Sequence, residues 1–433
     1  MNILMMTNTY KPILGGLEKS VEAFTKEFRR RGHRVLIITP EYDGAPEEED
    51  VIRIPAMQKF NGSDFSIQLP VPGVLEKVLE GLRPDIIHTH HPFLIGDTAL
   101  RLASKYNTPV VFTHHTLYEE NVHYVPGNQE ALRKFVIELS TGYANLADQV
   151  IAPSESVMQM MQGRGVQSPI HVVPTGIYEK NFSRGARLGF RGKFKIPKDA
   201  FVVGHLGRLA PEKNLEFVAK AVSKYLRGDV SAHCMIAGKG PSEEMIQEIF
   251  RREGVIDRLH MVGVVKGKDL VDAYHAMDVF AFASQSETQG LVLTEAMAAG
   301  VPVVGVDAPG VREVVRDKVN GRLLMQENLD DFFAALAWMK TQSPEMMKKM
   351  NAACRQTAHQ FSMESSVDKI SKVYLSSIID GFVRKSTGDN FLSSTLRLIE
   401  AQWRLTTNLS KAAVAMMTVQ PAKPVEMDEA VLV

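Results

Sequence analysis

The chain repeats one pattern, in which short apolar runs alternate with segments whose apolar positions recur every three or four residues. Apolar runs bounded by turn residues predict buried parallel strands, and the segments between them predict helices on both faces of a sheet. Helices are expected, for example, over Leu17–Arg31 and Gly96–Lys105. In the first part of the chain the strands are predicted at NILMMT, RVLIIT, DIIHTH, PVVFTH, QVIAPS and IHVVPTG.

A second series of runs follows the polar, glycine-rich stretch YEKNFSRGARLGFRGKFKIPKDA, whose composition is typical of a linker. The two series predict two doubly wound α/β domains, one over residues 1–176 and one over residues 177–361. A cleft is expected where the strand ends of the two domains face each other. The strands of the second series are predicted at FVVGHLG, AHCMIAG, LHMVGVV, DVFAFAS, PVVGVD and GRLLM.

Two further segments follow the second domain. Ser362 is a typical N-cap residue, and the spacing after it predicts a helix over 362–382. Residues 383–433 predict an amphipathic helical tail with a proline-containing end. Such a helix packs on the body of the protein, on a second subunit or on a membrane surface, and packing on protein is favoured. Its stripe consists of Leu392, Leu396, Ile399, Trp403, Leu409, Ala413 and Met416.

Composition narrows the class of protein. Fifty basic and fifty acidic side chains cancel, so no global field attracts nucleic acid or anionic lipid. Cys234 and Cys354 are far apart and predict neither a disulfide framework nor a zinc cluster. The first residues, MNILMMT, are interpreted as a strand instead of a signal peptide, and no apolar run approaches the roughly 18 residues of a membrane span. We expect a cytoplasmic protein, with peripheral contact to the inner face of the membrane left open.

Glycine turns and cations follow several predicted strands. Gly15 and Gly16 precede a helix, where backbone N–H groups and the helix dipole favour an anion. Arg208 and Lys213 follow a strand of the second domain and suit the same kind of ligand, although a solvated charge pair is the simpler interpretation. Gly238 begins a second anion-suited turn, GKGP, after the next strand.

The segment SQSETQGLVLTEAMAAG places two glutamates on either side of a helix start. Glu287 is expected in a loop and Glu295 about one turn into a helix that begins near Gly290. Amides at this N-terminus, including those of Leu291 and Val292, suit a phosphate, and the carboxylates suit sugar hydroxyls.

Histidines cluster in the first domain, where His88 and His90 form an H-x-H at a strand end. This spacing also occurs in metal-dependent hydrolases, but the chain lacks an eightfold strand–helix repeat with further ligands at later strand ends. No Asp-x-Asp occurs to hold a nucleotide-bound metal. For most of these histidines a hydrogen-bonded structural role is favoured.

Taken together, the motifs resemble the retaining glycosyltransferases of family 4, which have the GT-B fold. The resemblance extends from residue 1 to about residue 379 and rests on an ordered set. The set comprises Gly15-Gly16, THHT at 113–116, VVPTGI at 172–177, GRLAPEKN at 207–214, AGKGP at 237–241 and the E-x7-E of Glu287 and Glu295.

The resemblance implies a role for each matching residue. Arg208 and Lys213 would neutralise the donor diphosphate together with amides of Gly15, Gly16, Gly290, Leu291 and Val292, in place of a metal ion. Glu295 would bind the ribose, Glu287 the donor sugar, and Gly238 and Val264 would lie near the phosphates and the base. His115 would lie beside the anomeric carbon. No cofactor is implied. The acceptor side would include His88, His91, Tyr118 and His123.

Two stretches, HTHHPFLIG with THHTLYEENVHY and SETQGLVLTEAMAAG, look like bacterial diacylglycerol glucosyltransferases. This resemblance implies UDP-glucose as donor and diacylglycerol or a related glycolipid as acceptor. An enzyme of the same fold could instead use phosphatidylinositol, polysaccharide or a small sugar as acceptor, with GDP-mannose as a further donor. A metal-dependent hydrolase using His88 and His90 and a catalytically silent nucleotide-sugar-binding protein are the alternatives from other classes. The sequence leaves the oligomeric state open.

Overall fold

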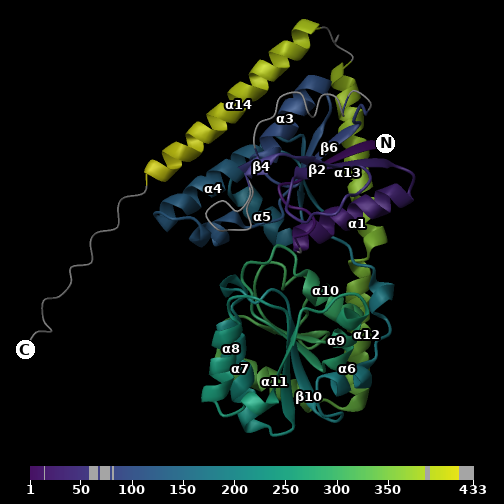
Figure 1. Ribbon diagram of the computed structural model, residues 1–433, viewed down its shortest axis with the longest axis vertical. Coiled ribbons are helices and arrows are strands. Elements are labelled where there is room, and N and C mark those ends of the chain that lie inside the picture. Colours follow the sequence, from purple (N-terminus) through teal and green to yellow (C-terminus); the bar gives the residue numbers. More distant parts are fainter. Residues whose placement is uncertain (14, 58–66, 69–78, 80–81, 386–390, 419–433) are drawn as a thin grey trace, which may run out of the picture.

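The computed structural model describes residues 1–13, 15–57, 67–68, 79, 82–385 and 391–418, which form two α/β domains (Figure 1). The first domain contains a seven-stranded parallel sheet in the order β3-β2-β1-β6-β7-β8-β9. Its strands are β1 (Asn2–Met6), β2 (Arg34–Pro40), β3 (Val51–Ile54), β6 (Ile86–Thr89), β7 (Val110–Thr113), β8 (Gln149–Ala152) and β9 (Ile170–Val172). The six strands expected from the apolar runs are confirmed, and β3 and the short antiparallel pair β4 (Ala56–Met57) and β5 (Ile67–Gln68) are additional.

Helices cover both faces of the first sheet. They are α1 (Gly16–Arg30), α3 (Ile95–Tyr106), α4 (Gln129–Ala144) and α5 (Glu155–Gly163), with a 3₁₀ helix, η2, over Tyr118–Tyr124. Ile3, Leu4, Met5 and Met6 of the central strand β1 are fully buried, because side chains on both faces of the strand meet helices. A parallel sheet covered on both faces accounts for the continuous apolar runs in the sequence.

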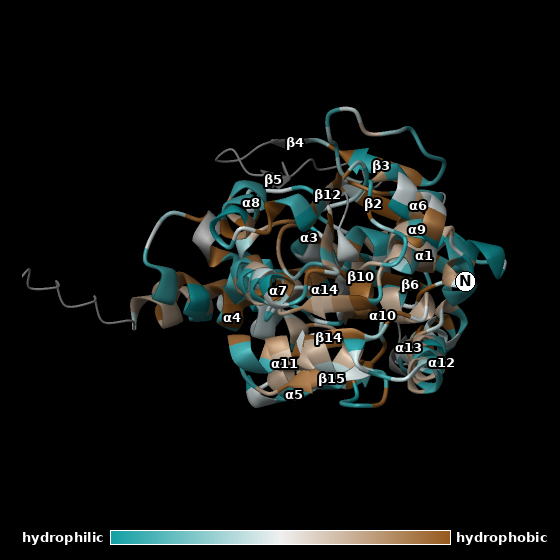
Figure 2. Ribbon diagram, turned by 90° about the horizontal axis from the view of Figure 1, so that it is seen from below, coloured by the Kyte–Doolittle hydropathy of each residue, from teal (hydrophilic) through white to brown (hydrophobic). Residues whose placement is uncertain are grey.

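The second domain repeats this plan with six parallel strands in the order β12-β11-β10-β13-β14-β15. They are β10 (Phe201–Leu206), β11 (Ala232–Ala237), β12 (Leu259–Gly263), β13 (Val279–Phe282), β14 (Val303–Val306) and β15 (Gly321–Leu324). Its helices include α7 (Leu215–Gly228), α8 (Glu243–Arg252), α9 (Lys268–Ala276), α10 (Leu291–Ala298), α11 (Leu329–Lys340) and α12 (Pro344–Gln360). Apolar residues concentrate on the inner strands and polar residues on the outer turns (Figure 2).

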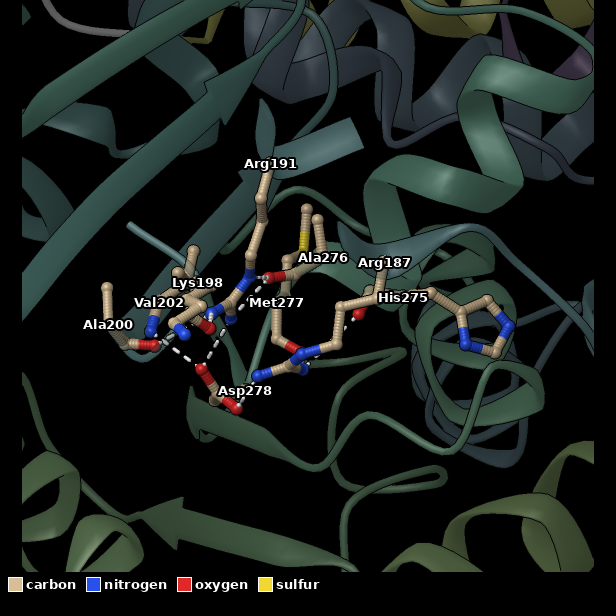
Figure 3. A network of polar contacts seen from close by, with 9 residues as sticks. All are labelled: Arg187, Arg191, Lys198, Ala200, Val202, His275, Ala276, Met277 and Asp278. Carbon is tan, nitrogen blue, oxygen red and sulfur yellow. Dashed lines mark hydrogen bonds and ion pairs between the residues drawn. The ribbon is translucent and has the colours of Figure 1, made fainter. Parts of the chain in front are cut away.

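The stretch interpreted as a linker is instead part of the second domain, so that prediction was wrong. It forms η3 (Glu179–Phe182) and α6 (Arg187–Lys193), which packs on α9. Arg191 is only 1% exposed, and its guanidinium donates to the carbonyl oxygens of Lys198, Ala200 and Ala276 and pairs with Asp278 at 2.8 Å (Figure 3). A buried charge is tolerated when each of its donors finds an acceptor, which polar composition by itself does not reveal.

The chain crosses back to the first domain after α12. Ile177 N donates to Phe361 O at 2.9 Å, and Met363 N donates to Ile177 O at 2.8 Å. The two backbones approach so closely that a Cβ on Gly176 would lie 2.3 Å from Met363 Cα. Helix α13 (Met363–Lys385) then packs along α1, with Tyr374 buried against the sheet (Figure 1).

Helix α14 (Phe391–Met417) lies on the outside of the first domain, across α3 and α4 (Figure 1). Its inner side buries Leu405 and Ala412 and places Asn408, which donates to Leu139 O at 3.1 Å. The expected proline-containing end, PAKPVEMDEAVLV, lies outside the described residues. Within the described ranges, no helix combines the length and the apolar content needed to cross a bilayer.

Candidate functional site

Two helix N-termini face each other between the domains. Gly15 precedes α1 of the first domain and Gly290 precedes α10 of the second, and neither helix start receives a side-chain cap. A Cβ on Gly16 would lie 3.8 Å from Leu291 Cδ1, so the two starts are in close approach. Gly290 has φ +71°, a left-handed conformation that favours glycine. The uncapped N–H groups of both helices therefore provide a concentrated site for an anion.

A lysine and a glutamate meet at the edge of the second sheet. Lys213 ends η4 (Pro211–Lys213), which follows β10, and its Nζ lies 2.7 Å from Glu287 Oε1 in the loop after β13. Both side chains are about one-fifth exposed. Arg208, from the same loop as Lys213, is more than half exposed and pairs with the buried Glu212. The structure thus joins Lys213 to Glu287, whereas Arg208 is paired with a neighbour four residues along.

Glu295 lies in α10 between partners from both domains. Tyr274 of α9 donates its hydroxyl to Glu295 Oε2 at 2.7 Å, and Lys19 Nζ of α1 lies 3.2 Å from Oε1. Burial, and then the charge of Glu295, raise the pKa of Tyr274 well above its ordinary value, so the phenol remains a donor. Tyr274 and Lys19 were not among the residues expected from the sequence.

The GKGP turn supports the loop that carries the cations. Gly238 has φ +143°, and a Cβ there would lie 1.9 Å from Gly207 O, so the two loops can pack together only with glycine at this position. Gly238 N donates to Gly263 O at 2.8 Å, which places the exposed Val264 next along the same edge. The three loops that follow β10, β11 and β12 therefore form one continuous rim.

A histidine that the sequence did not single out lies beneath this rim. His205 on β10 is 2% exposed, and its Nδ1 bonds to Ala281 O at 3.0 Å. Its Nε2 has no hydrogen-bond partner within the described structure. Burial lowers the pKa of His205, and the neighbouring charges of Lys213 and Glu287 act on it in opposite directions. In the sequence, the only signal for a role of His205 was its position near the end of the predicted strand VVGHLG.

Three first-domain histidines form a connected group, in which His88 and His90 are buried and His115 is half-buried. His90 Nδ1 lies 2.9 Å from His115 Nε2, and the rings of His88 and His90 are 4.1 Å apart. His88 bonds through Nε2 to Thr113 Oγ1 and through Nδ1 to the Tyr374 hydroxyl of α13, both at 2.7 Å. His88 therefore links the crossover helix to the strand that leads to His115.

Burial keeps these rings neutral. It lowers the pKa of His88 and His91 to about 3, that of His114 to about 4, and those of His90 and His115 well below 6.5. Both nitrogens of His88 already have partners. Among the described side chains, no group of three or more His, Cys, Asp or Glu is arranged to hold a metal ion. The hydrolase hypothesis based on His88 and His90 therefore gains no support from the geometry.

The other acceptor-side residues lie at different places in the first domain. His91 Nδ1 accepts from Asn8 N at 3.1 Å, whereas both ring nitrogens of the buried His114 have no partner in the described structure. The Tyr118 ring lies 5.8 Å from that of His114. The side chain of His123 lies outside the described part of the chain.

The two residues that follow Glu287 connect its loop to the first domain. Thr288 Oγ1 donates to His115 O at 2.9 Å. Gln289 is buried, and both ends of its amide bond to the backbone of Thr175. The loop that carries Glu287 is thus held beside His115, although the two residues belong to different domains.

Comparisons with known proteins agree with this architecture. Residues 14–180 match Glycosyltransferase Family 4, and residues 188–358 match Glycosyl transferases group 1. An alpha-monoglucosyldiacylglycerol synthase of Streptococcus pneumoniae is 28% identical over 89% of this chain and 88% of its own length. A GDP-mannose-dependent alpha-mannosyltransferase of Corynebacterium glutamicum is 27% identical over 75% and 76%. The crystal structure of Anabaena Alr3699/HepE in complex with UDP-glucose aligns with a TM-score of 0.68 at 20% identity, over 87% of this chain and all of the other.

Proposed function

This chain belongs to glycosyltransferase family 4 and is a glycosyltransferase with the GT-B fold, and from this premise we propose that it transfers glucose from UDP-glucose to diacylglycerol or a related glycolipid. The observation that carries the proposal is the similarity to the Streptococcus pneumoniae synthase, which covers 88% of that protein. The UDP-glucose held by a structural neighbour supports the choice of donor.

In this proposal the diphosphate binds between the two helix starts. The amides of Gly15 and Gly16 approach it from one side, and those of Gly290, Leu291 and Val292 from the other. Arg208 exchanges its exposed pairing with Glu212 for the phosphates, and Lys213 approaches from the position where it now meets Glu287. Gly238 and Val264, on the neighbouring loops of the rim, lie near the phosphates and the base.

The two glutamates divide the rest of the donor between them. Glu295 takes the ribose hydroxyls, oriented by the hydrogen bond from Tyr274, while Lys19 moves aside or bonds the same hydroxyls. Glu287 takes hydroxyls of the sugar, and its ion pair with Lys213 holds the carboxylate at that point. A carboxylate is an acceptor for several hydroxyl donors at once, which suits it to a sugar.

We propose a metal-independent transfer with retention of configuration. The bond between the anomeric carbon and the β-phosphate oxygen breaks, so negative charge grows on the phosphate while the sugar becomes positive. Preplaced cations and helix amides stabilise this charge more in the transition state than in the ground state. The acceptor hydroxyl attacks from the same face and passes its proton to the departing phosphate. His115, half-buried and with its pKa lowered by desolvation, lies beside the anomeric carbon without adding a positive charge there.

A related activity remains the second candidate. The similarity to a GDP-mannose-dependent mannosyltransferase favours mannose as an alternative sugar. Phosphatidylinositol, polysaccharide or a small sugar are the alternative acceptors. The same site residues would serve each of these reactions, because the diphosphate and ribose are common to both donors.

A donor and acceptor panel tests the proposal. Purified protein is given UDP-glucose, GDP-mannose and ADP-glucose, each with dioleoylglycerol, phosphatidylinositol or a soluble oligosaccharide, and products are identified by mass. We expect glucosyl-diacylglycerol from UDP-glucose, formed at the same rate with and without a chelator. Product only from GDP-mannose, or only on soluble acceptors, would contradict the glucolipid assignment. Donor binding without transfer to any acceptor would favour the silent binding protein.

A further inference from the structure

Helix α14 carries a second apolar stripe, on the side opposite the one that packs on the domain. At 3.6 residues per turn, the outward stripe lies about half a turn from Leu405 and Ala412, which are buried against α3 and α4. Its side chains are 59–80% exposed, and they are Leu396, Ile399, Trp403, Val414 and Met417. A helix that only completed the core of its own domain would be expected to carry polar residues here.

The first half of the stripe is centred on an aromatic residue. Trp403 is 73% exposed and lies one turn from Ile399, which is 62% exposed. A hollow of about 410 Å³ runs along this part of the helix, and the described residues that line it are Thr395, Leu398, Ile399, Gln402, Trp403 and Thr406. Contiguous exposed apolar residues around a tryptophan are typical of surfaces that enter a membrane interface.

The charge around the stripe is positive, although the whole chain is neutral. Helices α3 and α14 contain five basic side chains against two acidic ones, Asp97 and Glu400. Arg101 of α3 bonds Gln402 Oε1 at 3.0 Å, so the basic residues of α3 border the stripe. Arg404 and Lys411 are exposed and have no ion pair in the described structure. The basic residues are Arg101, Lys105, Arg397, Arg404 and Lys411.

We propose that this stripe, Leu396 to Met417, docks the enzyme on an anionic membrane surface. The proposal rests on the glycolipid acceptor proposed above, because such an acceptor resides in a bilayer and α14 lies on the acceptor-side domain. Apolar side chains enter the headgroup boundary, while the basic border gains about 1 kcal/mol per residue near anionic lipid. Helix α14 thereby adds three basic side chains next to those of α3, on a domain whose residues 1–175 carry 16 basic against 20 acidic side chains. If a second copy of the chain covered the stripe instead, the two α14 helices would form a two-fold antiparallel pair. The basic border of one copy would then lie against the basic border of the other.

Vesicle flotation tests the apolar stripe. The full chain is floated with vesicles of equal parts phosphatidylcholine and phosphatidylglycerol, or of phosphatidylcholine alone. The triple variant Leu396→Ser, Ile399→Ser, Trp403→Ser should reduce the partition into anionic vesicles at least about tenfold. The matched control, Leu188→Ser, Val230→Ser, Met325→Ser, removes equally exposed apolar side chains from the second domain and should leave binding unchanged.

Charge reversal tests the basic border. Arg404→Glu with Lys411→Glu should weaken binding to the anionic vesicles and make the remaining binding less sensitive to salt, whereas Lys198→Glu with Lys348→Glu in the second domain should change neither. Wild-type protein that fails to bind anionic vesicles, or a stripe variant that binds them as well as wild type, would overturn the proposal. A dimer that the stripe variant dissociates, measured by light scattering, would overturn it in favour of a second copy.

Activity with diacylglycerol in detergent micelles separates this proposal from the proposed function. The stripe variant should retain micellar activity within about twofold while losing activity on vesicles. No transfer to micellar diacylglycerol by the wild type would overturn the acceptor assignment, whatever the flotation result. Equal loss of micellar and vesicle activity in the stripe variant would overturn the docking role.

Discussion

Gln289 holds the backbone of Thr175 with both ends of its side-chain amide. Thr175 N donates to Gln289 Oε1 and Gln289 Nε2 donates to Thr175 O, each at 2.6 Å, and the glutamine is 6% exposed. Thr175 in turn donates its hydroxyl to Ser20 of α1 at 2.8 Å. The loop that begins with Glu287 is therefore fastened to the first domain immediately beyond its proposed sugar contact.

This clamp predicts the behaviour of two Gln289 variants. Gln289→Glu keeps the size but loses the donor to Thr175 O, and Gln289→Ala loses both bonds. Leaving buried polar groups unpaired costs about 1–3 kcal/mol each, so we expect kcat to fall at least about tenfold while UDP binding is retained. Steady-state kinetics and calorimetric UDP binding measure the two effects.

Gln285 provides the control for the clamp. It is exposed in the same loop and bonds to Glu327 instead of to the other domain. Gln285→Ala should therefore leave kcat within about twofold, since a solvated contact contributes little. If Gln285→Ala and Gln289→Ala lowered kcat equally, the effect on kcat would come from changing the loop itself and not from its attachment to Thr175.

Lys213 and Glu287 are expected to act on the transition state. Removing one preorganised charge partner typically costs about 3–4 kcal/mol, so Lys213→Ala should lower kcat/KM by roughly a hundredfold or more, and Glu287→Ala by at least tenfold. UDP release in the presence of acceptor is the measurement. Lys220→Ala, which removes an exposed lysine paired with Glu216, is the matched control and should be silent.

Glu295 should act on donor affinity. Glu295→Gln keeps the shape, weakens acceptance of the ribose hydroxyls and removes the ion pair with Lys19. We expect a higher KM for the donor with a smaller change in kcat, because the ribose does not react. Tyr274→Phe, which removes the hydrogen bond to Glu295, should move KM in the same direction. An unchanged KM in both variants would exclude a ribose contact at Glu295.

The buried histidines predict a loss of stability in acid. Folding lowers the pKa of His88 and His91 to about 3 and that of His114 to about 4, from 6.5. The unfolded chain therefore binds protons first, and their contribution is intact above 6.5 and is lost as the pH falls towards the folded values. The urea concentration at the midpoint of unfolding should therefore decrease as the pH is lowered across this range. His88→Gln should flatten the slope, while the exposed His359→Gln should leave it nearly unchanged.

Arg191 should be the most costly arginine to remove from the second domain. Arg191→Ala leaves the Ala276 and Ala200 carbonyls without their guanidinium donor and removes one of the two arginines that pair with Asp278, and breaking a buried pair typically costs about 3–5 kcal/mol. Arg187→Ala, whose side chain is 39% exposed and also pairs with Asp278, should cost less. The free energy of unfolding in urea measures both. A larger loss for Arg187→Ala would contradict the assignment of the network to Arg191.

What the sequence determined by itself was local or periodic. Apolar runs identified twelve strands of the two sheets because a strand covered on both faces must be apolar throughout, as in NILMMT at β1. The helix start at Gly290 with Glu287 before it and Glu295 after it could also be predicted, since all three lie within nine residues. The strand β3 was missed because its VIRI segment is short and only partly buried.

Tertiary structure decided the pairings between distant segments. Lys19 with Glu295, Gln289 with Thr175 and His88 with Tyr374 join residues more than one hundred positions apart, and no periodicity encodes such contacts. The polar segment around Arg191 resembled a linker because only the fold provides the carbonyls that satisfy its guanidinium. The apolar stripe of α14 was visible in the sequence, but the expectation that it packs on protein was wrong for Leu396, Ile399 and Trp403, which are exposed. The side that packs on α3 and α4 is instead the one that carries Leu405 and Ala412.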